Sequence, residues 1–218
     1  MKAILFILSL LLPCFVLGQS MDEKYVIYSG YLQVVNKGYI EHIKENCVFV
    51  VKAAPTYEEG VDEDIAQINI SLNDWKTYTR NINNEAVKAT LGLFWWKIPD
   101  SLKKDTLWFP LMDRLLESMK KKHYVKNSFT SDLHVSLLTY NDYTRYFDGH
   151  SYDWGAFKEN FGRYSELVDF SDVISDGKRA IFFCTEHYHD LGGSGNIVFF
   201  YKDASGWKYA GIWSLWMS

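Results

Sequence analysis

The chain has 218 residues, a formal net charge of −4 at pH 7, and 17% aromatic and 48% hydrophobic residues. An acidic chain is a poor candidate for binding nucleic acid, because contacts to phosphates require a basic face, and the longest basic run here is the lysines at 120–122. The composition is typical of a folded domain and excludes a long charged, disordered tail.

The first residues, MKAILFILSLLLPCFVLGQS, have the layout of a secretory signal peptide. Lys2 provides a positive start, an apolar run extends from Ala3 to Leu12, and small or apolar residues precede Gln19. We expect cleavage after Gly18, which would remove Lys2 and take the net charge from −4 to −5. The apolar run is too short to cross a bilayer as a helix, and no later stretch reaches about 18 apolar residues, so no membrane span is expected.

Residues 19–218 are long enough for one domain with a substantial core, and no linker or internal repeat divides them. With residues 1–18 as signal peptide, we expect a single exported domain that acts in the periplasm or outside the cell. A lipid anchor on Cys14 is disfavoured, because Pro13 directly before it fits that processing badly.

The first two patterns of the exported domain are a helix and a strand. Residues 24–35, KYVIYSGYLQVV, place apolar side chains at helical spacing, although Gly30 weakens the prediction. Residues 47–55, CVFVVKAAP, predict a buried strand that ends at Pro55.

Two helices are predicted next. Residues 71–81, SLNDWKTYTRN, begin with Ser71 as an N-cap and Asp74 three residues later, which indicates a short helix. Residues 110–123, PLMDRLLESMKKKH, begin with Pro110 in a first-turn position, repeat apolar residues every four positions, and end in lysines that the helix dipole favours. This second segment has the strongest helix pattern in the chain.

The next two segments predict one strand and one short helix. Residues 132–140, DLHVSLLTY, alternate as a strand does. Residues 153–162, DWGAFKENFG, predict one or two helical turns, with Phe157 and Phe161 four positions apart and Gly162 as the stop.

The C-terminal part contains four strand-like runs separated by turn signals. The runs are ELVDFSDVI, KRAIFFCTEHY, NIVFFYKD and WKYAGIWSLW, and the turns are SDG, HDLGGSG and ASG. They predict a four-stranded antiparallel meander over residues 166–216. The fold class is therefore α+β, with helices from the N-terminal two-thirds covering one face of the sheet.

Three segments resemble a group of uncharacterised exported bacterial proteins. They are YVIYSGYLQVV near the start, LHVSLLTYNDYTRYF in the middle, and the C-terminal stretch from FSDVISDGKRAIFFCTEHYHDLGGSGN to GWKYAGIWSLWMS. In that group a hairpin carries a Cys-x-x-x-Cys-Gly-x-Gly pattern and the chain ends in a GxWK strand. Gly193 and Gly195 match the glycines, whereas Tyr188 and Gly192 occupy the cysteine positions. The resemblance implies export and a similar fold, and it implies no reaction.

The stretch EHYHD at 186–190 is the first candidate site. On a strand, His187 and His189 would share one face, and Glu186 and Tyr188 the other. A His-x-His pair can supply two zinc ligands, so the metal hypothesis uses His187 and His189 with Glu186 and Asp190. The alternative is a polar hairpin rim, which we favour because no other histidine pair has metal-ligand spacing.

Ser194, in GGSGN, is the second candidate. Gly192 satisfies the first glycine of a G-x-S-x-G nucleophile elbow, but Asn196 stands at its last position and an apolar strand follows instead of a helix. The segment also lacks the Lys-Ser/Thr ending of a phosphate loop. We therefore assign no catalytic residue and no cofactor site, and expect the glycines to serve a tight turn with positive φ.

The acidic stretch TYEEGVDEDIAQ is the third candidate, because oxygen-rich loops can bind calcium. Its carboxylates are Glu58, Glu59, Asp62, Glu63 and Asp64. The spacing does not fit a calcium loop, so a solvated loop is predicted.

The tryptophans and cysteines each leave two interpretations open. Trp95, Trp96, Trp207, Trp213 and Trp216 are predicted to fill the core, with a ligand-stacking platform as the alternative. Cys47 and Cys184 could form a disulfide in an exported protein, or remain buried thiols on strands.

Together these patterns favour an exported, non-enzymatic binding or accessory protein whose partner is an unknown protein or small ligand. One alternative is a metal-dependent hydrolase or metal-binding protein that uses His187 and His189. The other is a periplasmic immunity or inhibitor protein, a role that small acidic α+β domains can have.

Overall fold

The computed structural model describes residues 23–53, 61–80, 102, 104–121, 123–129, 133–147, 152–189 and 192–218. A first helix, called here the N-terminal helix, covers residues 23–37. The elements that follow are α2 (Glu41–Lys44), β1 (Val48–Lys52), α3 (Val61–Arg80), η1 (Thr106–Trp108), α6 (Phe109–Met119), β2 (His134–Leu138), α7 (Tyr140–Tyr146), α8 (Trp154–Phe161), β3 (Glu166–Phe170), β4 (Ile174–Ser175), β5 (Arg179–His189), β6 (Gly192–Asp203) and β7 (Gly206–Met217).

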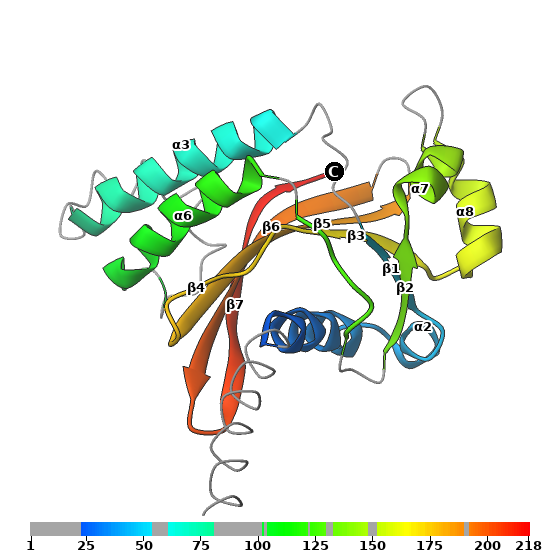
Figure 1. The fold of residues 1–218 in the computed structure, drawn as a ribbon, viewed down its shortest axis with the longest axis horizontal. Helices are drawn as coiled ribbons and strands as arrows, with labels where there is room; N and C mark the ends of the chain where they lie inside the picture. The colour runs from blue at the N-terminus through cyan, green and yellow to red at the C-terminus, as the bar shows by residue number, and fades with distance from the viewer. Residues whose placement is uncertain are drawn as a thin grey trace, which may run out of the picture.

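The centre of the molecule is a mixed sheet of seven strands (Figure 1). Its order is β2-β1-β3-β5-β6-β7, and the short β4 pairs with β5 beside β3. β1 runs parallel to β2 and β3, whereas all pairs from β3 to β7 are antiparallel. The α+β prediction is confirmed. The sheet is larger than the four-stranded meander expected, because β1 and β2 extend it and the first C-terminal run is divided into β3 and β4.

Helices cover both faces of this sheet, and this corrects the expectation that they cover one. Because side chains alternate along a strand, Ile181 and Phe183 of β5 face α3 and α6, whereas Phe182 and Cys184 face the N-terminal helix. α7 and α8 pack on β1, β2 and β3 through a third cluster that includes Phe157. Figure 1 shows the N-terminal helix below the sheet, with α3 and α6 above one side and α7 and α8 above the other.

The N-terminal helix packs on the sheet through aromatic side chains. The Tyr28 ring stacks on Phe170 with centroids 4.5 Å apart, and meets Phe182 edge-on at 5.3 Å. Gly30 lies where the helix faces Phe200 of β6, since a Cβ there would be 3.3 Å from the Phe200 ring. The glycine that weakens the helix pattern therefore allows the helix to approach the sheet.

α3 is one continuous helix, and the prediction that a short helix begins at Ser71 is wrong. Ile68, Leu72 and Trp75 are fully buried at spacings of four and three residues, so the apolar stripe passes straight across Ser71. Packing of this stripe outweighs the local capping signal at Ser71.

Other local signals are confirmed. Pro110 lies in the first turn of α6, and Gly162 ends α8 with a φ of 103°. Gly177, in the turn before β5, and Gly206, the first residue of β7, have φ values of 85° and 113°, which glycine adopts without a Cβ clash.

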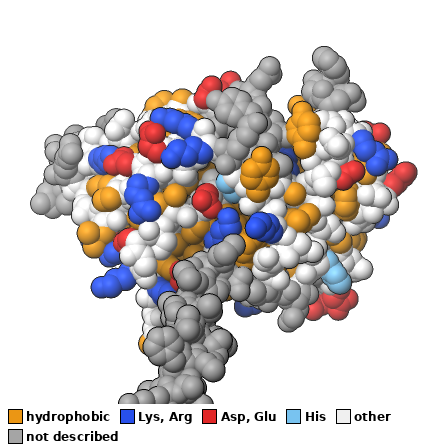
Figure 2. Space-filling view, viewed as in Figure 1, with side chains coloured by type: hydrophobic (Ala, Val, Ile, Leu, Met, Phe, Trp, Pro, Cys, Tyr) orange, Lys and Arg blue, Asp and Glu red, His pale blue; other side chains and the backbone are white. Residues whose placement is uncertain are grey.

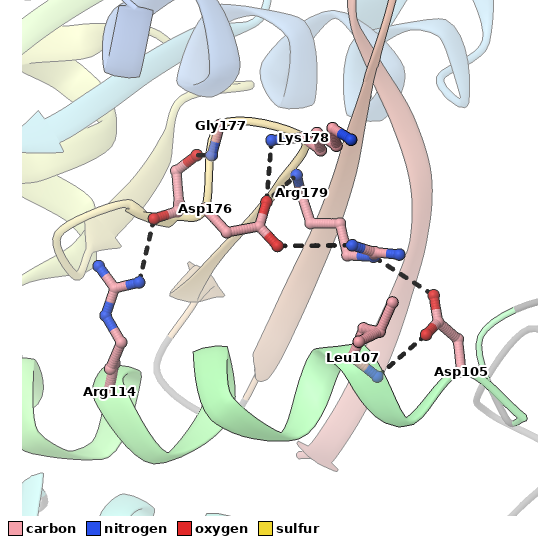
Figure 3. Close-up of polar contacts among 8 residues, drawn as sticks. Asp105, Leu107, Arg114, Asp176, Gly177, Lys178 and Arg179 are labelled. Carbon is pink, nitrogen blue, oxygen red and sulfur yellow. Dashed lines mark hydrogen bonds and ion pairs between the residues drawn. The ribbon is translucent and has the colours of Figure 1, made fainter.

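The turn between β4 and β5 is tied to the α6 layer by polar contacts (Figure 3). The Arg179 side chain contacts Asp176 at 3.4 Å within the turn and Asp105 at 3.3 Å beyond it. Arg114 of α6 donates to the carbonyl of Ser175 at 3.1 Å. These contacts fix α6 against the start of β5.

On the face seen in Figure 2, the acidic and basic side chains of the described residues are interspersed with apolar ones. Within the described residues, no helix is long and apolar enough to cross a membrane.

Candidate functional site

Two glutamate side chains are buried on the sheet face that the N-terminal helix covers. Glu166, the first residue of β3, is 7% exposed, and Glu186 of β5 is 4% exposed. Carboxylates are almost never this buried without a specific reason, because burial strongly disfavours their charged form. These two buried carboxyls and the groups that contact them therefore form the candidate site.

The sheet register places the two carboxyls next to each other. Val168 of β3 lies directly opposite Glu186, and Leu167 lies opposite His187. Glu166 is two residues from Val168, so it is the diagonal neighbour of Glu186 on the same face, at roughly 7–8 Å between backbones. Side chains of this length can bring their carboxyl groups well within that separation.

Hydroxyl groups donate to both carboxyls, some from neighbouring strand residues and some from distant parts of the chain. Tyr31 of the N-terminal helix donates to Oε1 of Glu186 at 2.7 Å, and Tyr188 donates to Oε2 at 2.9 Å. Ser194 of β6 donates more weakly to Oε2 at 3.4 Å. Tyr39, which follows the N-terminal helix, donates to Oε1 of Glu166. We call this group the carboxyl cluster; its members are Glu166, Glu186, Tyr31, Tyr39, Tyr188 and Ser194.

Oε2 of Glu166 differs from the other carboxyl oxygens of the cluster. Oε2 of Glu166 is buried and has no hydrogen-bond partner among the described residues. Buried polar atoms are nearly always satisfied, so each exception requires an explanation.

Burial also changes the protonation of the cluster. It raises the pKa of Glu166 to about 7, with the charge of Glu186 raising it further and the Tyr39 hydrogen bond and Lys158 opposing the change. Burial likewise raises the pKa of Glu186, against the three hydroxyl donors. Near neutral pH Glu166 can therefore be protonated or ionised, and a small change in its surroundings can move its proton.

The predicted zinc ligands do not converge in the described structure. Glu186 and Tyr188 do share a face, and Glu186 points away from the face of His187. Asp190 lies outside the described residues. Among the residues that are described, no group of three or more His, Cys, Asp or Glu side chains is arranged to hold a metal ion. The zinc hypothesis stays a prediction.

The rings of the two histidines cover glycines of β6. His189 lies over Gly192, His187 over Gly193, and Trp216 of β7 over Gly195. A Cβ on Gly192 would be 2.4 Å from the His189 ring, and one on Gly195 would be 2.1 Å from Nε1 of Trp216. None of these glycines has a positive φ. The tight-turn explanation for them is thus wrong: they lie in a strand and make room for rings.

Ser194 is a buried member of the hydrogen-bond network. Its hydroxyl contacts Glu186 and accepts from the side-chain amide of Asn196 at 2.8 Å. It lies within β6, with no turn into a helix, so the geometry of a nucleophile elbow is missing there.

The acidic stretch forms the start of a helix where a loop was expected. Asp62, Glu63 and Asp64 lie in the first turn of α3, where the helix dipole favours negative charge, and Glu58 and Glu59 lie outside the described residues. Asp64 accepts from Nε1 of Trp216 at 2.9 Å. Its role here is to hold α3 to the end of β7.

The tryptophans divide between core and partly buried positions. Trp213 is 5% exposed and meets the Trp75 ring edge-on at 5.6 Å, so it belongs to the core. Trp207 and Trp216 are partly buried. Trp95 and Trp96 lie outside the described residues.

Cys47 and Cys184 are free, buried thiols, and the structure does not support the disulfide. Cys184 pairs with Phe170, whereas Cys47 precedes Phe49, which pairs with Glu166. At about 3.3 Å per residue, the step from Glu166 to Phe170 separates the cysteines by at least about 13 Å along the sheet. A disulfide requires Cα atoms within about 7 Å.

The sequence patterns did not indicate Glu166, Tyr31 or Tyr39 as site residues. Glu186 was indicated only as a zinc ligand, although period-two alternation puts it on the same face as the buried Phe182 and Cys184. The same argument applies to Glu166, two positions before the buried Val168.

Comparison of the chain with models of protein families, with curated proteins and with solved structures gave no match.

Proposed function

We propose that the protein is an exported binding protein without catalytic activity, and that it binds a small ligand at the carboxyl cluster. The observation that carries this proposal is the buried Oε2 of Glu166, which has no partner among the described residues. An unsatisfied buried polar group costs about 1–3 kcal/mol, and more when charged. A ligand that donates a hydrogen bond to this oxygen would recover that free energy.

The position of the cluster also supports binding. It lies where β5 ends and β6 begins, at the end of the sheet. Tyr39 and Tyr188 are only partly buried, so the cluster borders solvent through these two rings. A small ligand could reach Glu166 from that side after a local side-chain movement.

The low reactivity of the two cysteine thiols beside the cluster argues for binding over catalysis. Burial raises the pKa of Cys47 to about 12, and burial and Glu186 raise that of Cys184. The nucleophilic form of cysteine is the thiolate, which neither residue forms at neutral pH.

Thermal unfolding of the purified protein with a ligand panel tests this function. The panel holds cationic, neutral and anionic metabolite-like compounds, together with Zn²⁺ to test the metal alternative. A ligand at 100 times its Kd adds about 2.7 kcal/mol, which raises Tm by roughly 5–10 °C for a chain of this size.

Two variants make the test specific. Glu166→Gln should lose the shift, whereas Glu159→Gln, the same change at an exposed position on α8, should keep it. The proposal is wrong if no compound raises Tm, or if both variants respond as the wild type does. Export is tested separately by N-terminal sequencing of the protein secreted by its own cells, with Gln19 expected as the first residue.

A further inference from the structure

The two buried carboxyls are surrounded by neutral hydrogen-bond donors. Glu186 contacts three hydroxyl groups, and Glu166 contacts one, from Tyr39. Neither carboxyl forms an ion pair with a Lys, Arg or His of the described segments. When both are ionised, no described residue therefore provides a counter-charge in direct contact with the pair.

Lys158 of α8 is a cation whose charge acts on Glu166. Its ammonium donates to the carbonyl oxygen of Ser165 and lies 5.8 Å from the centroid of the Trp154 ring. Lys158 is thus held by a backbone carbonyl. It offsets part of the negative charge from a distance and leaves Oε2 of Glu166 without a donor.

Apart from Lys158, the groups of the described segments whose pKa is shifted by Glu166 or Glu186 add no positive charge. They are the hydroxyls of Tyr31, Tyr39, Tyr188 and Tyr209 and the thiols of Cys47 and Cys184. Burial raises the pKa of each, so all of them are uncharged at neutral pH. The cluster has an excess of acidic groups over bases.

We propose that the cluster takes a cationic ligand with an ammonium group, which donates a hydrogen bond to Oε2 of Glu166 and displaces the proton that this carboxyl otherwise binds. This inference rests on the proposed binding function and adds the class of ligand and the effect of pH. An ammonium supplies both missing items, a donor and a positive charge, whereas a neutral donor supplies only the first. The Tyr39 and Tyr188 rings add surfaces that attract a cation.

The proton balance gives the direction of the pH effect. Only the ionised carboxylate of Glu166 offers both its charge and its free oxygen to an ammonium. With the pKa of Glu166 raised to about 7, binding below that pH releases a proton from Glu166 to solvent. Affinity should therefore rise up to about tenfold per pH unit below pH 7, and level off above it.

Three probes of equal chain length separate the ligand classes. They are butylammonium, butanol and butyrate, at equal concentration and ionic strength. Thermal unfolding is measured with each probe at about pH 5 and about pH 8, on either side of the Glu166 titration. We expect butylammonium alone to raise Tm, more at the higher pH, with the effect lost in Glu166→Gln and kept in Glu159→Gln.

Each other outcome has a defined meaning. A rise with butanol that Glu166→Gln abolishes would overturn the cationic class and leave the binding function standing. A butylammonium effect that is equal at both pH values, or equal in Glu166→Gln, would overturn the inference, because no Glu166 proton would be involved. If none of the three probes raises Tm, the inference is overturned as well, and the wider ligand panel then tests the binding function. The wild-type comparison across pH requires no variant, so a variant that fails to fold does not spoil the test.

Discussion

Replacing Glu166 by Gln should change how the stability of the folded protein depends on pH. Burial raises the pKa of Glu166 above its ordinary value, so the folded state binds a proton that the unfolded state has already lost. The stabilising effect of that proton is fully present below the unfolded pKa of 4.5 and is lost as pH rises to about 7. Glutamine cannot ionise, so the stability of the Glu166→Gln variant does not fall in this way as pH rises.

The rise from 4.5 to about 7 corresponds to roughly 3 kcal/mol of unfolding free energy, at about 1.4 kcal/mol per unit. His123 acts in the opposite direction. Burial lowers its pKa to about 4, so the neutral folded form gains stability as pH rises from 4 to 6.5. The two effects are similar in size, and the wild-type profile alone could therefore look flat. The difference between wild type and Glu166→Gln cancels His123 and isolates Glu166.

The assay is urea-induced unfolding of wild type, Glu166→Gln and Glu159→Gln at about pH 4.5 and about pH 8. From the lower to the higher pH, the unfolding free energy of Glu166→Gln should rise by about 3 kcal/mol relative to that of the wild type. Any effect of the new amide that does not depend on pH cancels in this comparison. Glu159→Gln should show no such gain. A Glu166→Gln difference that is the same at both pH values would refute the reasoning.

Two further predictions concern packing and the thiols. Gly195→Ala should lower the free energy of unfolding by about 1–3 kcal/mol, because its Cβ would displace the Trp216 ring that donates to Asp64. The control Gly155→Ala, whose Cβ would have only a 3.4 Å contact to Asp153, should change the free energy of unfolding by less than about 1 kcal/mol. Equal effects of the two changes in chemical denaturation would contradict the packing of the Trp216 ring on Gly195. Cys47 and Cys184 should both resist alkylation in the native protein and both react in denaturant without reductant, as read by peptide mass mapping. A requirement for reductant would show that they are paired.

Local sequence patterns predicted most of the separate elements. Pro110 and Gly162 mark helix ends through backbone geometry that neighbouring residues determine. The pairing of β1 with β2 and β3 could not be predicted, because parallel strands are joined by long connections and their partners are set by contacts far along the chain. At Ser71, packing of the apolar stripe of α3 overrides the local capping signal.

The candidate site was only partly predictable, for a similar reason. Alternation along β5 correctly places Glu186 and Tyr188 on one face, which the N-terminal helix covers, and Glu186 is buried there. Its partner Tyr31 is 155 residues away in the chain, and Tyr39 is 127 residues from Glu166. Contacts at such separations exist only once the N-terminal helix has packed on the sheet.

An NMR titration of the glutamate side-chain carboxyl carbons tests the buried carboxyl pair itself. We expect Glu166 to titrate near pH 7, Glu186 to titrate above its ordinary range, and Glu186→Gln to lower the pKa of Glu166 by removing a neighbouring charge. If both carboxyls titrate near the ordinary value of 4.5, the buried pair does not exist as described, and the binding site built on it is wrong.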